Sequence, residues 1–549
     1  MPVSKRCGLP YPNEDIRPNR KNKSLPTGDF DLPTKSVVMC GFLFLDQIDS
    51  QAISEHLFSK ALQLQAWRGP DAQHLMERKN GFVRLGHNRL SIIDPVSRSD
   101  QPMVSSDGRF VLVFNGEIYN HLALRKNMPV AFSTKSVTET ILVGYALWGD
   151  RIFSMLDGMY AIVIYDTVED QWIAARDPLG VKPLFIHRSQ KLTLIGSEPC
   201  SLASLCGASL CPQSVEEWKL VRRPVPGRSF FRGIDEVIPG QIMKKRGETQ
   251  RFWRLAASDE PYSQERFEEL MDEAIRMHEM SDVRNVSLLS GGLDSAVITA
   301  VSSVSACYTI GLPGNSEINE ASETAKQLGR QIVALELSPE EMVSTWRDLT
   351  VLRGEPIGVP NEAMIYAICR KMEPDEKVVL TGEGADELLF GYDQIFRWAS
   401  EGNWQGTDEF LRRYGYSTMA VPTDRLRHYT ETLRGDKTTL QFVEDFFFGL
   451  HLPGLLRRMD FASMAASKEA RVPFVTKALV NYMYRRPGEI KISPQESKIP
   501  LRRYAQRLGL VGALHRKKIG FSATIGPAKN KYDEYSHFQS IVTAQLGCN

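Results

Sequence analysis

Residues 285–295 read NVSLLSGGLDS, a short apolar run that leads directly into a glycine-rich turn and the start of a helix. The run has the length and apolar character of a buried strand. Gly291 and Gly292 let backbone amides approach an anion closely, and the first helical turn adds partial positive charge. The spacing matches neither the GxxxxGK loop nor the GxGxxG turn. We expect a loop that binds phosphate or pyrophosphate; for this stretch alone, a glycine-rich turn without a ligand is the simpler alternative.

A second motif of the same kind follows the apolar run KVVL, where residues 381–387 read TGEGADE. Its three carboxylates, on Glu383, Asp386 and Glu387, repel one another unless a cation lies among them. Ligands also gather at the carboxyl ends of strands in open parallel sheets. The motif therefore predicts a magnesium site, with the ion carried by ATP.

The pattern around these motifs predicts the fold of the carboxyl-terminal half. NVSLLS, ACYTIGL, QIVALEL and KVVL read as short buried strands, and helices are predicted between them at 295–304, 321–331 and 361–372. Strands that alternate with helices indicate an α/β fold, a parallel sheet covered by helices on both faces. Beyond about Asp393 helical segments predominate.

The amino-terminal half has a different pattern. From Ser36 to about Leu255 short β-like runs dominate, each bounded by Gly, Pro or Asp, which favours an α+β domain with large, mainly antiparallel sheets. The composition turns polar at Ala256–Gln264, so we place one domain at 40–255 and the other at 264–549. Residues 1–39 are interpreted as a flexible extension or propeptide.

Composition limits the class of partner. The 549 residues carry a formal net charge of only +1, with both signs interleaved, so neither nucleic acid nor an anionic membrane is an expected partner. No apolar run approaches the roughly 18 to 20 residues of a membrane span. The eight cysteines have no CxxC pairs, which argues against structural zinc. Small-molecule substrates and a cytoplasmic location are expected.

Both motifs resemble those of a known family. SGGLDS resembles the pyrophosphate loop of N-type ATP pyrophosphatases, and TGEGADELLFGY resembles the matching segment of asparagine synthetases and their relatives, the β-lactam synthetases. The resemblance extends over nearly all of the chain from Met39 onward. It continues through EPIGVPNEAMIYA (355–367), SMAASKEARVPFV (463–475), SKIPLRRYA (497–505) and RKKIGF (516–521). It implies a domain that adenylates a carboxylate and releases pyrophosphate, with ATP and Mg²⁺ as cofactors.

The resemblance also implies roles for single residues. Asp294 and Asp386 would hold magnesium on the pyrophosphate, and Lys498 would stabilise charge developing on the phosphates. Glu383 would accept a proton from attacking ammonia. The ATP-binding residues that it implies are Leu288, Ser290, Gly291, Gly292, Asp294, Ser295, Ile310, Thr381 and Gly382.

The amino-terminal half resembles class II glutamine amidotransferases of the N-terminal-nucleophile type. The matching stretches are MCGFLFL from Met39, RGPD at 68–71, LGHNRLSIID at 85–94 and FNGEIYN at 114–120. In that class a cysteine attacks the side-chain amide of glutamine, and the cysteine's own α-amino group relays the proton. The resemblance therefore implies that Cys40 is the nucleophile.

Further residues of these stretches would bind glutamine. Asn115 and Gly116 would form the oxyanion hole, and Arg89 would clamp the glutamine carboxylate by a bidentate pair. Asn115 and Glu117 are expected to contact the bound glutamine as well.

Two features depart from the family pattern. Cys40 carries an amide nitrogen unless the residues before it are absent or removed, so we expect translation from Met39 with trimming, or cleavage of a propeptide. Val137 stands where the family usually has an aspartate that pairs with the glutamine ammonium, and an apolar side chain cannot replace it. Low glutamine affinity, or ammonia as the nitrogen donor, would follow.

Three functions fit these motifs. The first is glutamine-dependent asparagine synthesis through β-aspartyl-AMP, with ammonia moving through an internal passage and a homodimer expected by resemblance. The second is a β-lactam synthetase-like amide ligase of secondary metabolism with an inactive glutaminase domain, which Val137 and the PFVT stretch at 473–476 favour. The third, a non-catalytic regulatory protein, would leave the clustered carboxylates without their metal.

Overall fold

The computed structural model describes residues 40–50, 52–69, 71–89, 92–94, 99–314, 317–516 and 531–547. All of them lie in one unit, Val37–Asn549. The predicted extension at 1–39 and most of the RKKIGF stretch lie outside the described residues. None of the described helices has both the length and the apolarity that a membrane-spanning helix needs.

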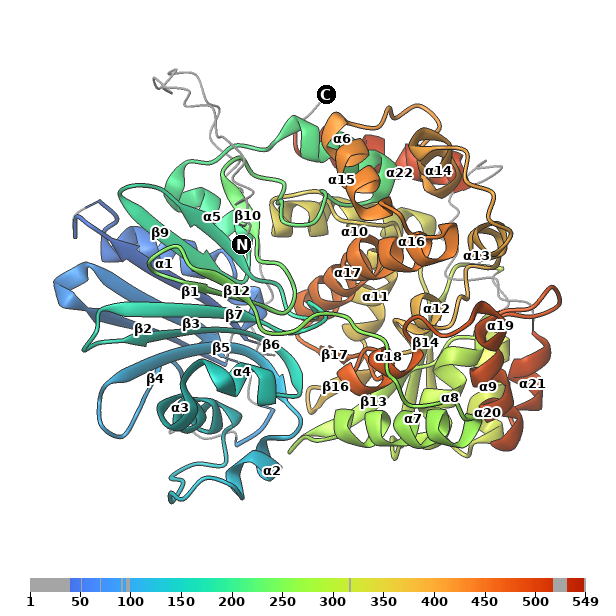
Figure 1. Ribbon diagram of the computed structural model, residues 1–549, viewed down its shortest axis with the longest axis horizontal. Helices are drawn as coiled ribbons and strands as arrows, with labels where there is room; N and C mark the ends of the chain where they lie inside the picture. Colours follow the sequence, from blue (N-terminus) through green and yellow to red (C-terminus); the bar gives the residue numbers. More distant parts are fainter. Residues whose placement is uncertain are drawn as a thin grey trace, which may run out of the picture. The chain divides into compact units, whose positions relative to one another are not determined.

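The amino-terminal half contains two six-stranded sheets whose paired strands are all antiparallel (Figure 1). The first sheet has the order β10-β8-β9-β1-β3-β2 and the second β12-β11-β7-β6-β5-β4. The strands of the first are β1 Gly41–Gln47, β2 Ala72–Arg78, β3 Val83–Arg89, β8 Phe185–Arg188, β9 Leu192–Gly196 and β10 Ile234–Glu236. Those of the second are β4 Met103–Val104, β5 Phe110–Ile118, β6 Gly158–Asp166, β7 Gln171–Arg176, β11 Gln241–Lys244 and β12 Thr249–Arg251.

Alternation along the strands explains how these sheets pack. Phe42 and Phe44 of β1 belong to a core shared with β5 and β6 of the other sheet, whereas Leu43 and Leu45 face helices. Both faces of the strand are therefore buried, which is why the stretch reads as a continuous apolar run. The helices of this half are α1 Glu55–Gln63, α2 His121–Arg125, α3 Val137–Trp148, α4 Ile152–Met155, α5 Pro199–Cys206 and α6 Pro212–Val221.

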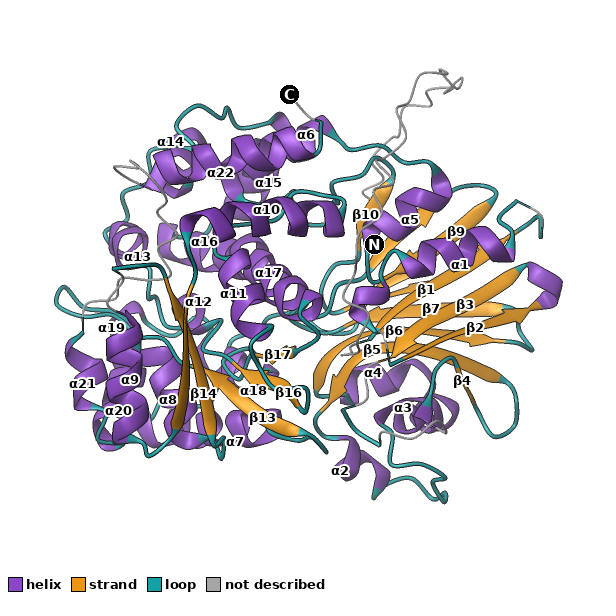
Figure 2. Ribbon diagram, turned by 180° about the vertical axis from the view of Figure 1, so that it is seen from behind, coloured by secondary structure: helices purple, strands orange, loops and turns teal. Residues whose placement is uncertain are grey.

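The carboxyl-terminal half contains the predicted parallel sheet, with the order β15-β14-β13-β16-β17 (Figure 2). The strands are β13 Arg284–Leu288, β14 Ala306–Gly311, β15 Gln331–Glu336, β16 Glu376–Leu380 and β17 Glu469–Arg471. The alternating helices are α7 Gln264–His278, α8 Leu293–Val301, α9 Glu317–Gln327, α10 Pro339–Arg353, α11 Glu362–Cys369 and α12 Ala385–Leu388. The α/β prediction for this half and the α+β prediction for the other are both confirmed.

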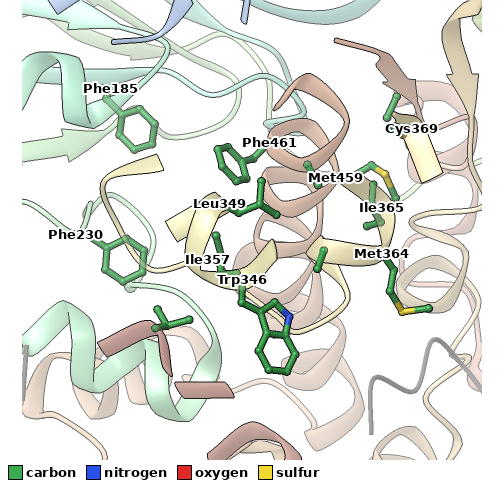
Figure 3. Close-up of a cluster of buried hydrophobic side chains, with 14 of the residues drawn as sticks. Phe185, Phe230, Trp346, Leu349, Ile357, Met364, Ile365, Cys369, Met459 and Phe461 are labelled. Carbon is green, nitrogen blue, oxygen red and sulfur yellow. The ribbon is translucent and has the colours of Figure 1, made fainter. Parts of the chain in front are cut away.

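The two faces of this sheet are covered by different helices. Residues of α7, α8 and α20 form one apolar cluster with Leu380 of β16. Its neighbour Val379 belongs instead to a cluster with α10, α11 and α17, which also takes in Phe185 and Phe230 of the amino-terminal half (Figure 3). A single core therefore joins the two halves.

One prediction for this sheet was wrong. The QIVALEL stretch was predicted to be buried, but β15 is mostly exposed, and the side chain of Val333 keeps 41% of its accessible surface. The reason is position, because β15 is the terminal strand of the sheet and pairs with a neighbour, β14, on one side only.

Helices make up most of the chain beyond Asp393, as predicted. They are α13 Asp393–Ser400, α14 Thr407–Tyr414, α15 Asp424–Arg434, α16 Thr439–Phe446, α17 Leu452–Ala465, α18 Lys477–Met483, α19 Gly488–Lys491, α20 Ile499–Arg507, α21 Val511–His515 and α22 Lys531–Gln545. A π-helical turn at Phe447–His451 separates α16 from α17.

Candidate functional site

The SGGLDS loop connects the end of β13 to the start of α8, with Gly292 as the residue that caps the helix. Two serines hold its shape: the Ser290 amide donates to Ser295 Oγ at 3.0 Å, and the Gly292 amide donates to Ser290 Oγ at 3.2 Å. Backbone amides and a helix amino terminus thus lie together, as anion binding requires.

The second motif follows β16, which pairs directly with β13, so the two loops lie next to each other. Gly382 makes that contact close, because a Cβ there would lie 2.9 Å from Asp294 Cβ and 3.0 Å from the Ser295 amide nitrogen. The Thr381 amide donates to the carbonyl of Arg471 at 3.0 Å. Leu288 is the last residue of β13, and Ile310 is the last but one of the neighbouring β14, so both lie near the same edge of the sheet. Their contact with adenosine stays a prediction.

Lys498 brings the two acidic motifs together. Its Nζ lies 2.6 Å from Asp294 Oδ2 and 2.6 Å from Asp386 Oδ1. The residue stands directly before α20 with a φ of 57°, a left-handed conformation that aims the side chain at this site. Gly391 leaves space for the Asp386 carboxylate, since a Cβ at position 391 would lie 1.9 Å from Asp386 Oδ1.

This arrangement suits a cation on the pyrophosphate. The carboxylates of Asp294 and Asp386 share one ammonium, so the three groups together keep a net negative charge. Carboxylate oxygens are also the ligands that Mg²⁺ prefers. Among the residues that the structure describes, no group of three or more His, Cys, Asp or Glu side chains could hold a metal by itself. Asp294 and Asp386 are close enough to share Lys498, and their predicted role in holding an ion on the pyrophosphate stays a prediction.

Glu383 has a partner that the sequence did not reveal. Its carboxylate pairs with the guanidinium of Arg458, which lies in α17 and also donates to Asn361 Oδ1 at 3.2 Å. Only the doubled arginine at 457–458 in front of the SMAASKEARVPFV stretch hinted at it. Arg458 therefore holds the predicted proton acceptor in place.

Most of the predicted glutamine site lies around one cavity of the amino-terminal half. Its lining includes Cys40, Arg89, Gly116, Glu117 and Val137. Cys40 stands directly before β1, and its carbonyl accepts a hydrogen bond from Arg68 Nε at 3.2 Å. Arg68 belongs to the RGPD stretch, so that motif positions the predicted nucleophile.

Asn115 and Gly116, the residues predicted to form the oxyanion hole, have local features that suit this role. Asn115 is 1% exposed, and its Nδ2 donates to no group in the described part of the chain. A buried donor without a partner is costly, so a ligand oxygen is the expected acceptor. Gly116 has a φ of 143°, and a Cβ there would lie 1.9 Å from the carbonyl oxygen of Met159, so only glycine fits.

Arg89 and Glu117 each have a protein partner. Arg89 Nη1 lies 2.5 Å from Asp100 Oδ1, and its Nη2 donates to the Asp94 carbonyl at 2.7 Å. Burial raises the pKa of Glu117 to about 8, although Arg471 opposes that shift from 3.3 Å away. Asp100 and Arg471 are residues that sequence reasoning missed.

Val137 lines the cavity as an apolar side chain. It is 5% exposed and packs into the cluster that α3 forms with β5. No carboxylate stands at this position to pair with a glutamine ammonium, as the sequence indicated. Among the described residues, the carboxylates that line the cavity are those of Glu117 and Glu469.

Buried charges connect the two halves. Arg68 of the amino-terminal half pairs with Asp460 of α17 at 2.9 Å, and Lys182 pairs with the same carboxylate at 3.3 Å. Arg471 of β17 contacts Glu117, while its carbonyl accepts the Thr381 amide. One residue therefore contacts both the glutamine cavity and the end of β16.

An apolar cluster also lies between the two sites. We call it the apolar bridge, and it consists of Met159, Val181, Leu452, Leu456, Val472 and Val475. Met159 of the bridge packs against Gly116, where an added Cβ would touch the Met159 carbonyl. Val475 of the bridge packs against Gly384, where an added Cβ would lie 2.4 Å from Val475 Cγ2. Met159, Val181, Val472 and Val475 also line a small cavity.

Comparison with known proteins gives two family matches. Residues 39–253 match the model of a glutamine amidotransferase domain, and residues 266–541, half of the chain, match the model described as asparagine synthase. The two models meet near the polar stretch where the composition changes.

Curated relatives cover most of the chain. "Asparagine synthetase (glutamine-hydrolyzing) 1" of Bacillus subtilis is 26% identical over 90% of this chain and 89% of its own length. "Asparagine synthetase B (glutamine-hydrolyzing)" of Escherichia coli is 30% identical over 64% of this chain and 65% of its own. "Amidase chry2" of Gibberella zeae is 29% identical over 77% of this chain and 66% of its own.

Proposed function

This chain belongs to the asparagine synthase family, and we propose that it makes asparagine from aspartate and glutamine, cleaving ATP to AMP and pyrophosphate through β-aspartyl-AMP. The observation that carries the proposal is the convergence of Asp294, Asp386 and Lys498 at the carboxyl edge of a parallel sheet. That edge is where ligands bind in open α/β sheets.

Adenylation is assigned to the carboxyl-terminal half. A carboxylate oxygen of the acceptor attacks the α-phosphorus of ATP, and the bond to the departing pyrophosphate breaks. Ser290, Gly291, Gly292 and Ser295 form the loop that would bind the anion, and hydrogen bonds from the Ser290 and Gly292 amides to serine hydroxyls fix the shape of this loop. Asp294 and Asp386 would hold Mg²⁺, which neutralises charge on the pyrophosphate when bound, and Lys498 adds a fixed positive charge there.

Amide formation follows at the acyl carbon. Ammonia attacks the adenylated carboxyl, AMP leaves with the bonding electrons, and one ammonium proton passes to the Glu383 carboxylate. Arg458 supports this role because it fixes the carboxylate through an ion pair. A general base has to lie within hydrogen-bonding reach of the proton that it accepts.

Glutamine hydrolysis is assigned to the amino-terminal half, once Cys40 carries a free α-amino group. The Cys40 thiol attacks the glutamine amide, its proton passes through the α-amino group to the leaving nitrogen, and Asn115 Nδ2 donates to the oxyanion. Ammonia leaves, and water then hydrolyses the thioester to glutamate and restores the thiol. Neutral ammonia can move along apolar side chains, and the apolar bridge joins the environment of Gly116 to that of Gly384. This contiguity supports an internal passage.

A second candidate is a related amide ligase that adenylates its substrate but does not use glutamine. Val137 favours it, because no carboxylate stands at this position of the cavity for the glutamine ammonium. In that case ammonia or an amine would attack the same adenylate.

The test uses protein expressed from Met1 and from Met39, with magnesium-ATP, aspartate, and either glutamine or ammonium. Pyrophosphate, glutamate and asparagine are measured together. Cys40→Ala should abolish only glutamine-dependent turnover, whereas Asp386→Asn should abolish turnover with both donors. Asparagine from ammonium alone in the Met39 form would favour the second candidate, and no asparagine with either donor would refute the proposal.

A further inference from the structure

A second cavity lies between the two halves, beside Glu383. Its lining contains six arginines, among them Arg222, Arg223 and Arg458, and three glutamates, Glu236, Glu355 and Glu362. Three of these arginines, Arg222, Arg223 and Arg228, and Glu236 come from the amino-terminal half, and the other charged residues come from the carboxyl-terminal half. The lining therefore has an excess of positive charge, which favours an anionic occupant.

Three buried polar atoms of this lining have no hydrogen-bond partner among the described residues. Two are donors, Arg223 Nη1 and Arg458 Nε, and one is an acceptor, Glu355 Oε2. Arg223 and Arg458 are each 9% exposed and Glu355 is 2% exposed. Buried charged groups with unused hydrogen-bonding capacity are costly, so a ligand that satisfies them binds favourably.

Their chemistry matches an α-amino carboxylate group. Two guanidinium donors suit a carboxylate, and a carboxylate oxygen suits an ammonium. The other hydrogen bonds of these side chains hold them rigidly: Arg223 Nη2 pairs with Glu236 at 2.5 Å, and Glu355 Oε1 accepts from Arg353 at 2.9 Å. A ligand would meet groups that are already ordered.

Arg458 connects this cavity to the reaction centre. Its Nη2 pairs with Glu383, the proposed proton acceptor, while its Nε is unpaired and the residue lines the cavity. Both atoms belong to one planar guanidinium. A molecule that contacts Glu383 at one end and Arg458 Nε at the other therefore needs only a short chain between these ends. Phe185 and Phe230 also line the cavity and add apolar surface to it; Figure 3 shows both rings.

We propose that Arg223 of the amino-terminal half is a specificity-determining residue for the acceptor, binding the carboxylate that is not adenylated, while Glu355 binds the ammonium on the same carbon. The acceptor is then a short amino dicarboxylate. The cavity that selects it is complete only when both halves of the chain are present. This inference rests on the proposed function.

The first experiment measures ammonium-dependent pyrophosphate release, which bypasses the glutamine site. Arg223→Gln should raise the KM for L-aspartate at least tenfold, with kcat and the KM for ATP changed less than threefold, and Arg223→Lys should recover part of the loss. Arg427→Gln is the matched control, because that partly exposed arginine pairs with Asp408 and does not line the cavity. A wild-type KM for aspartate in Arg223→Gln would overturn the proposal.

The second experiment compares L-aspartate with succinate, which lacks only the ammonium. Wild-type protein should prefer aspartate, and Glu355→Gln should reduce that preference at least tenfold. An unchanged preference would overturn the role of Glu355. Melting temperatures of all variants identify any that fail to fold, and in that event Arg223→Lys decides for the arginine.

Direct binding separates failure of this inference from failure of the proposed function. L-aspartate is titrated calorimetrically into wild-type protein and into Arg223→Gln. Binding that the variant loses would support the inference even if no asparagine forms. Absence of aspartate binding to folded wild-type protein would overturn it.

Discussion

Asn115→Ala offers a test of the oxyanion hole that separates catalysis from stability. Nδ2 of Asn115 is buried and donates to no described group, so its removal breaks no hydrogen bond of the resting protein made by that atom. An unpaired buried donor costs roughly 1–3 kcal/mol, and removing it relieves that cost. The free energy of unfolding should therefore change by no more than about 1 kcal/mol.

Catalysis should respond much more strongly. One oxyanion-hole donor is worth about 2.7–4 kcal/mol in the transition state, which corresponds to a loss of roughly 10²–10³ in kcat for glutamine hydrolysis. Glutamate formation is measured with protein that begins at Cys40, and ammonium-dependent pyrophosphate release serves as the internal reference. That reference should stay within about twofold, because the proposed adenylation site lies in the other half.

The matched control is Asn127→Ala, which removes an exposed amide from the turn after α2. It should leave both activities unchanged. The reasoning is refuted if Asn115→Ala keeps glutaminase activity within tenfold of wild type, or if ammonium-dependent activity falls by the same factor.

Three further predictions follow from the same geometry. Lys498→Met removes the ammonium that contacts both Asp294 and Asp386, so pyrophosphate release should fall at least a hundredfold with either nitrogen donor while glutamine hydrolysis persists; loss of glutaminase alone would contradict this. Val181→Phe adds bulk to the apolar bridge and should lower the stability by about 1–3 kcal/mol. Because less ammonia would reach the second site, the ratio of glutamate to asparagine formed should rise above that of wild type. An unchanged ratio would count against the passage. Burial lowers the pKa of His87 and of His278 to about 3, so both stay neutral in the folded protein while the unfolded chain takes up protons near pH 6.5. Stability should therefore fall as the pH drops from 6.5 towards 4, by about 1.4 kcal/mol per pH unit for each histidine, and His278→Phe should reduce that slope in urea titrations.

Some of the fold was readable from short stretches of sequence. The apolar runs before SGGLDS and TGEGADE are β13 and β16, and the alternation of strands and helices indicated the parallel sheet. Such signals are local, because strand length, glycine turns and apolar periodicity are properties of neighbouring residues. The exposure of β15 escaped this reasoning, since the same apolar pattern occurs in central and in terminal strands.

The hydrogen-bonding and ion-pair partners of the site residues could not be predicted from the sequence. Arg458 stands 75 positions from Glu383, and Asp100, which pairs with Arg89, stands 11 positions from it. Nothing in the spacing of charged residues indicates which of the 67 basic side chains meets a given carboxylate. These ion pairs depend on the order of the strands in the sheets and on where α17 packs between the two halves of the chain.

The sequence by itself determined the two kinds of domain and indicated the two chemistries proposed for them, because the predicted phosphate-binding loop, the predicted metal motif and the cysteine with its predicted oxyanion stretch are each contiguous. Only the tertiary structure decided how they are connected. Arg471 contacts both sites, the apolar bridge spans the distance between them, and Arg223 reaches a cavity beside Glu383. These contacts join residues hundreds of positions apart, and packing of the two halves, rather than any local preference of the chain, brings them together.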